Sequence, residues 1–183
     1  MNDSTTGVGF SRRAGVAAAL AAVALARPFG AAAAFISQRG MVGGGLVKFE
    51  GGDANFSLLA SKLTFPDDRE VVVGSLLWVA TGSGLTLAST ALTDYENLAG
   101  QEKGKRIRGT LTSNGVGAFP FMLDVIDGGA PGSGKDSIAL TVGDFVTPAA
   151  GEAAGTPSGF HYAAVGMLAT GDLQDLDIDI PEP

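Results

Sequence analysis

Cysteine is absent from this chain of 183 residues, and histidine and tryptophan each occur once. Without thiols the chain has no disulfide scaffold, no thiolate metal site and no cysteine nucleophile. His161, between Phe160 and Tyr162, cannot form a catalytic triad unless the fold brings a serine and an aspartate beside it. We therefore expect His161 at the surface or at a strand end. Trp78 lies in the most apolar stretch and is expected in the core, with a sugar-stacking platform as the alternative.

Charged residues are few, at 17%, and acidic residues outnumber basic ones by 19 to 12, which gives a net charge of -7. Because nucleic acids and anionic membranes attract basic surfaces, this balance argues against both as partners. We expect a protein or a cell-surface structure as the partner. We also expect no membrane span after residues 1–34, since no later apolar segment approaches the ~20 residues of a spanning helix.

Glycine is abundant, with 28 residues, about twice the usual share of ~7%. No collagen-like period and no Gly/Ser repeat accompanies it, so the excess indicates many turns rather than disorder. The apolar content of 45% is sufficient for the core of one domain.

The N-terminal region has the three parts of a signal peptide. Arg12 and Arg13 precede an Ala-rich apolar stretch at 14–26, and Ala32 and Ala34 offer a small-residue cleavage site. The adjacent arginines resemble a twin-arginine signal, although Gly15 stands where that signal usually has a bulky apolar residue. The general export route is the alternative. By either route we expect an exported protein, in the periplasm, on the cell surface or outside the cell.

The rest of the chain predicts an all-β domain, as a single antiparallel sandwich or barrel. We expect a cleaved signal-peptide helix at 1–34, a linker at 35–45 and the β domain at 46–180. Period-two alternation and turn residues predict about nine strands. These are 46–50, 54–61, 70–79, 85–92, 105–113, 119–126, 138–142, 160–169 and 173–180. The third is nearly all apolar and is expected to be buried on both faces. Polar or flexible loops are expected at 94–104 and 147–158.

A Gly-rich loop separates the strands at 119–126 and 138–142. Residues 129–135 spell G-x-x-x-x-G-K, the beginning of a phosphate-binding loop. Asp136 replaces the magnesium-binding Ser or Thr, and a β-type sequence follows where a helix N-terminus would be needed. We interpret the segment as a hairpin loop rather than a nucleotide site. A calcium site formed by Asp124, Asp127 and Asp136 is the alternative, and calcium is the one cofactor considered.

Asp175, Asp177 and Asp179 alternate with apolar residues, so their carboxylates should lie on one face. A solvated face, or an edge protected from pairing with other chains, is the simplest interpretation. Two sharper ones compete with it. The row could bind calcium, or it could lie beside the basic strand that contains Lys105, Arg106 and Arg108 and form cross-strand pairs. Of these two we prefer the second, because it uses the chain's basic cluster.

Several short motifs, taken in order, resemble the post-COAP-1 type β-domain of exported prokaryotic proteins. They are Gly-Gly-Gly at 43–45, Arg-Gly-Thr-Leu at 108–111, Asn-Gly at 114–115, Phe-Pro-Phe at 119–121, the loop at 127–132, Asp-Ser-Ile at 136–138 and Gly-Asp-Leu-Gln at 171–174. The resemblance covers roughly residues 40–178 and consists mostly of turn residues. It implies an all-β fold and an extracytoplasmic setting, and it implies no catalytic residues.

The function expected from these features is that of an exported, non-enzymatic β domain with a structural or binding role at or beyond the cell surface. A small-ligand-binding barrel or sandwich is the alternative. A hydrolase that uses dispersed carboxylates comes third, and nothing in the sequence nominates its pair.

Overall fold

The computed structural model describes residues 35–130, 132–146 and 158–179. Within them lie nine strands: β1 (Ser37–Phe49), β2 (Gly52–Thr64), β3 (Glu70–Ala80), β4 (Leu85–Asn97), β5 (Gly104–Ser113), β6 (Val116–Ile126), β7 (Ser137–Gly143), β8 (His161–Asp175) and β9 (Ile178–Asp179). The expected signal peptide, with Arg12, Arg13, Ala32 and Ala34, lies outside the described residues, as do residues 147–157 of the expected flexible loop. None of the described residues forms a helix with the length and apolarity that a membrane crossing requires.

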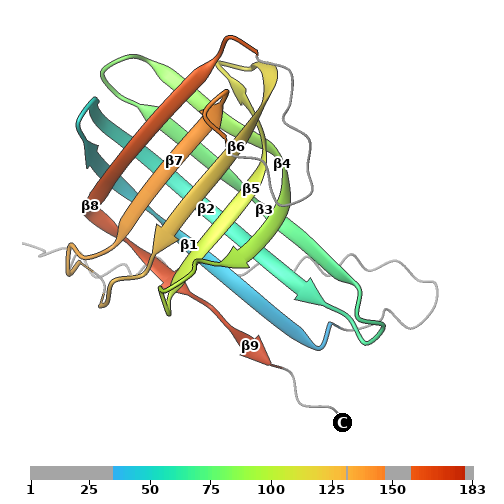
Figure 1. Ribbon diagram of the computed structural model, residues 1–183. Helices are drawn as coiled ribbons and strands as arrows, with labels where there is room; N and C mark the ends of the chain where they lie inside the picture. The colour runs from blue at the N-terminus through green and yellow to red at the C-terminus, as the bar shows by residue number, and fades with distance from the viewer. Residues whose placement is uncertain (1–34, 131, 147–157, 180–183) are drawn as a thin grey trace, which may run out of the picture. The chain divides into compact units, whose positions relative to one another are not determined.

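Strands β1 to β8 form a closed antiparallel barrel (Figure 1). Each strand pairs with the next along the chain, and β8 returns to pair with β1. The sequence predicted an all-β sandwich or barrel, and the observed fold is the barrel. The short β9 continues along β1 past the end of β8, with Ser37 opposite Asp179. The break between β8 and β9 spans Leu176 and Asp177.

Alternation along the strands fills the barrel with apolar side chains. Trp78 is fully buried, as predicted. Its ring lies 6.1 Å from that of Phe49, 6.3 Å from that of Phe56 and 6.4 Å from that of Tyr162. The indole N–H donates a hydrogen bond of 3.0 Å to the Tyr162 hydroxyl. This bond satisfies the polar atom of a side chain that has no access to water.

The expectation that the third strand is buried on both faces is wrong. In β3, Leu76 and Trp78 are buried, whereas Val73 and Leu77 are 43% and 42% exposed. A single-layer barrel has only one inner face, so half of an apolar strand must face outward. The polar loop expected at 94–104 is also shorter than predicted, because β4 continues to Asn97.

The expected linker at 35–45 is a second correction, because Ser37 to Gly45 forms most of β1. Strand β1 lies between β2 and β8 and closes the barrel. Its glycines permit the close approach of β8: a Cβ at Gly43 would clash with the carbonyl oxygen of Asp172, and one at Gly45 with that of Thr170. The glycines that predicted a linker are therefore needed for packing, because β1 has a neighbouring strand on each side.

The strands predicted at 160–169 and 173–180 are also corrected. A single strand, β8, covers the first of them from His161 and continues through Leu173 to Asp175.

We expect Trp78→Ala to destabilise the protein by about 3–5 kcal/mol, because it removes a fully buried aromatic side chain and leaves a cavity. The neighbouring Leu77→Ala is the matched control on the same strand. Its side chain faces outward, so it should cost less than about 1 kcal/mol. Urea unfolding of both variants checks that Trp78 faces inward and Leu77 outward. Equal losses of unfolding free energy would contradict this assignment.

Candidate functional site

An ionic cluster lies inside one end of the barrel, centred on Lys105. Lys105 has the same strand phase as the buried Ile107 and Leu111, so its side chain points inward and is 2% exposed. Its Nζ lies 3.2 Å from Asp175 Oδ1, 3.5 Å from Asp177 Oδ2 and 3.1 Å from Asn97 Oδ1. A buried ammonium is thus matched by two carboxylates and an amide oxygen, which reduces the cost of its desolvation.

Two more side chains complete the cluster. Arg39, on β1, places its Nε 3.8 Å from Asp177 Oδ2. Tyr95, on β4, is 2% exposed, and its hydroxyl has no hydrogen-bond partner among the described residues. Burial raises the pKa of Tyr95, and the carboxylates of Asp175 and Asp177 raise it further. Burial also raises the pKa of Asp175, against the opposing effect of Lys105.

The expected pairing of the aspartate row with the basic strand occurs for Lys105, by a different geometry. Strands β5 and β8 are not neighbours in the sheet, so Lys105 meets Asp175 and Asp177 across the barrel interior. Asp179 is described by its backbone alone.

Arg106 and Arg108 lie on the outer face and pair with neighbouring strands. Arg106 binds both oxygens of Asp124 at 2.7 Å. Arg108 lies 3.9 Å from Asp94 and 3.8 Å from Glu96. The expected cross-strand charge pairs are therefore present on the outside of β4, β5 and β6, with acidic partners other than the row at 175–179.

The three aspartates considered for calcium have different partners. Asp124 faces outward and is engaged by Arg106. Asp136 is 3% exposed; its Oδ1 accepts from the Gly128 N–H and its Oδ2 from the Leu173 N–H, both at 2.9 Å. No group of three or more acidic or histidine side chains suited to a metal occurs within 35–130, 132–146 and 158–179. Calcium binding stays a prediction, to be tested against a structural role for these carboxylates.

That structural role follows from unequal strand lengths. Strand β7 begins at Ser137, opposite Met167, so the rest of β8 has no partner on that side. Asp136 accepts the N–H of Leu173, and Asp127 Oδ2 accepts the N–H of Asp175 at 3.3 Å. Side-chain carboxylates of the β6–β7 loop thus replace the missing strand and satisfy backbone groups that would otherwise be buried unpaired.

The loop at 127–136 is the predicted hairpin loop. Strand β7 follows it directly, and the part of the chain that the structure describes has no helix whose N-terminus could face it. A Cβ at Gly128 would clash with the carbonyl of Lys135, so the loop closes only with glycine there. Asp172 lies close by, and its Oδ1 is buried without a hydrogen-bond partner in the described part of the chain. Burial raises the pKa of Asp172, and the charges of Asp136 and Asp127 add to that effect.

The opposite end of the barrel carries His161 and a shallow pocket. His161 is exposed at the first position of β8, as predicted, and its ring stacks 4.5 Å from that of Phe145. Hydrogen bonds from the backbone and hydroxyl of Ser158, together with the Gly159 N–H, lower the pKa of Asp144.

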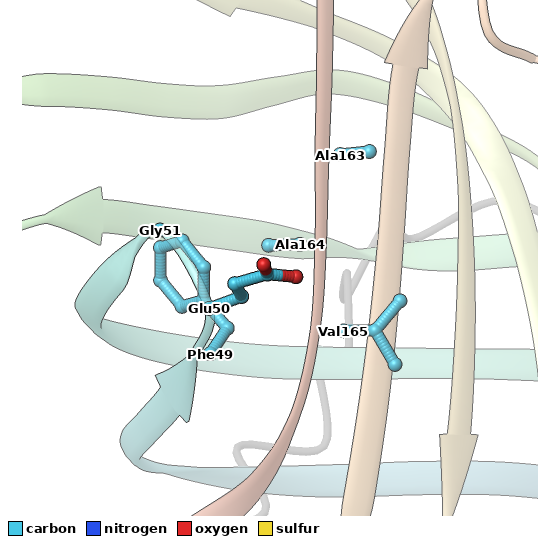
Figure 2. A pocket seen from close by; sticks show the side chains of 6 residues that line it. All are labelled: Phe49, Glu50, Gly51, Ala163, Ala164 and Val165. Atoms are coloured by element: carbon cyan, nitrogen blue, oxygen red, sulfur yellow. The ribbon is translucent and has the colours of Figure 1, made fainter.

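The pocket has a volume of about 220 Å³. It lies between the end of β1, with the turn that follows it, and residues 163–165 of β8 (Figure 2). The figure shows the carboxylate of Glu50 directed toward the strand that bears Ala163, Ala164 and Val165, with the ring of Phe49 beside it. The lining is mostly apolar, with one carboxylate at Glu50.

Sequence reasoning missed Arg39, Tyr95 and Asn97 as members of the ionic cluster. Arg39 was assigned to the linker, and the other two to a loop. Two register shifts in β4, at 89–91 and 92–94, interrupt the alternation between the buried Leu87 and Tyr95. The phase of Lys105 was readable, because it matches Ile107 and Leu111.

Comparison of the chain with protein-family models, with curated proteins and with solved structures finds no match.

We expect Asp136→Ala to destabilise the protein by about 3 kcal/mol, because two backbone N–H groups lose a charged acceptor. The loss should be the same in EDTA and in millimolar calcium, as measured by thermal melts and urea unfolding. Asp124→Asn is the control, and its partly exposed ion pair should contribute less than about 1 kcal/mol. A large rise of the wild-type melting temperature in calcium, abolished by Asp136→Ala, would instead establish the calcium site.

Proposed function

We propose that this chain is an exported, non-enzymatic β-barrel domain with a structural or binding role at or beyond the cell surface. The observation that carries the proposal is the packed interior of the barrel. Apolar side chains from all eight strands fill it, and the ionic cluster occupies one end. A barrel filled in this way is a rigid scaffold, and recognition then falls to its outer surface and loops.

Export is supported by the sequence alone, through the paired arginines and the apolar stretch at 14–26. The lack of cysteine is compatible with this setting, because a closed barrel with a continuous core does not depend on disulfides. The outer surface supports a binding role because it presents both charged and apolar side chains. It carries the charge pairs of β4, β5 and β6, and it exposes apolar side chains at Leu59, Val165 and Met167.

A carboxylate-dependent hydrolase is less well supported. Asp175 and Asp177 are the candidates, since Asp175 is largely buried and its pKa is raised by burial. The ammonium of Lys105 lies within 3.5 Å of both carboxylates. It occupies the position between them that a scissile bond would require.

The pocket in Figure 2 favours the small-ligand alternative, which we keep as the second candidate. Its volume of about 220 Å³ is below the ~300–1,000 Å³ of most ligand sites. A ligand there would contact Phe49, whose ring lies 6.1 Å from that of Trp78. The chain's single tryptophan is therefore a reporter for this site.

Export is tested by expressing the full chain in a bacterium that has the twin-arginine route and fractionating the cells. We expect the wild type outside the cytoplasm, shortened by residues 1–34, and the double variant Arg12→Lys, Arg13→Lys retained inside. Lysine keeps the charge, so retention reports recognition of arginine itself. Export of both proteins would assign the general route. An unprocessed wild type inside the cell would overturn the export proposal.

Ligand binding is tested by titrating the protein with an apolar fluorescent probe, 1-anilinonaphthalene-8-sulfonate, while Trp78 emission is recorded. If recognition is external and the interior is packed, Trp78 emission should not change in a saturable way. Phe49→Ala enlarges the pocket and is the positive comparison. A saturable, stoichiometric change in the wild type would favour the small-ligand barrel over the proposed function.

A further inference from the structure

We propose that Lys105 and Asp175 react with each other in the folded protein to form an intramolecular amide bond that links β5 to β8 across the barrel. The inference goes beyond the proposed function and does not depend on it. It rests on an amine and a carboxyl held in contact inside a barrel, with the groups that such a condensation requires around them.

The two reacting groups are in place and shielded from water. Lys105 Nζ lies 3.2 Å from Asp175 Oδ1, and the two side chains are 2% and 15% exposed. Their sheet partners, Val125 opposite Lys105 and Met41 opposite Asp175, are fully buried. Groups fixed at this distance react with effective molarities on the order of 10⁵–10⁸ M in favourable cases.

The reaction balances without any other reagent. A proton passes from the ammonium to the carboxylate, which leaves a neutral amine and a neutral carboxyl. A low-dielectric site favours this neutral form over the separated charges. The amine nitrogen then attacks Cγ, the bond from Cγ to one carboxyl oxygen breaks, and one water leaves. The products are an amide and a water molecule.

Neighbouring side chains supply the two functions that the condensation needs. Asp177, with Oδ2 3.5 Å from Nζ, can accept a proton from the attacking nitrogen and return it to the departing hydroxyl. The Tyr95 hydroxyl lies in the field of Asp175 and has no hydrogen-bond partner in the described part of the chain. It is a donor for the oxyanion that develops on Asp175. Asn97 Oδ1, at 3.1 Å, orients the nitrogen.

Two other close ion pairs among the described residues lack this combination. Lys62 and Glu70 are closer, at 2.9 Å, but their side chains are 27% and 51% exposed. Both side chains therefore stay in contact with water. Arg106 and Asp124 meet at 2.7 Å, but a guanidinium does not give up its proton to become a nucleophile. The exposed lysine pair thus serves as an internal control.

The bond would give a cysteine-free protein a covalent cross-link. It would tie the end of β8, where carboxylates replace the partner strand, to the opposite wall of the barrel. A link between distant positions restricts the unfolded chain in the same way as a disulfide that closes a long loop.

The test is mass spectrometry of the purified full chain and of its tryptic peptides. No lysine or arginine follows Lys135, so trypsin releases residues 136–183 as one peptide. Trypsin cannot cleave after a lysine whose Nζ is in an amide. We therefore expect peptide 104–106 joined to peptide 136–183, with a mass lower than their sum by one water, and the same deficit in the intact chain. Fragmentation should place the branch at Lys105 and Asp175, while Lys62 and Glu70 stay unlinked.

Lys105→Arg is the matched control, because it keeps the cation and cannot form the bond. It should fold, as judged by a cooperative melt, and show no deficit. Asp177→Asn should slow bond formation in freshly refolded protein by ~100-fold, and Tyr95→Phe should also slow it. A wild-type chain at its full mass, with peptide 136–183 unbranched after prolonged incubation, overturns the proposal. Loss of ammonia with a branch at Asn97 would also overturn it, since the acceptor would then be a different residue.

Discussion

Backbone hydrogen bonding along β8 is the constraint on which the rest of this barrel depends. Strand β8 has 15 residues and β7 has seven, so closing the sheet leaves the part of β8 after Met167 without a partner strand on that side. Buried N–H groups must find acceptors, and Asp136 and Asp127 provide them from the β6–β7 loop. The Gly-rich sequence of that loop is what lets the two carboxylates reach the edge of the strand.

The same closure creates the ionic cluster. Once β8 is held against β1, Asp175 and Asp177 point into the end of the barrel and meet Lys105 from the far wall. Removing Lys105 and Asp175 from water is costly, and their pairing with each other and with the more exposed Asp177 offsets much of that cost. The three charged side chains differ in their exposure to water: Lys105 is the most buried, Asp175 is intermediate and Asp177 is the most exposed. Burial raises the pKa of Asp175 and of Tyr95, and the charges of Asp175 and Asp177 raise the pKa of Tyr95 further.

Local patterns predicted strands more reliably than they predicted burial. Alternation located β2, β5, β6 and β7 closely, because each carries one apolar face. It failed for β3, whose apolar outer residues mimic a strand buried on both sides. It also failed for β1, because the glycines that allow β8 to approach closely also resemble a linker sequence. The members of the candidate site were only partly predictable. Lys105 keeps the phase of its apolar neighbours, whereas Tyr95 lies after two register shifts of β4, in a segment predicted as a loop.

The sequence by itself determined the all-β class, the turns, the hairpin nature of the 127–136 loop and the burial of Trp78. These depend on residue types within a few positions of one another, through alternation and turn chemistry. Only the tertiary structure decided that the sheet closes, that Asp136 caps β8, and that Lys105 faces Asp175 across the interior. Residues so far apart along the chain lie next to each other because the intervening strands pair and the sheet closes. Their proximity is a property of the closed barrel, and no local pattern encodes it.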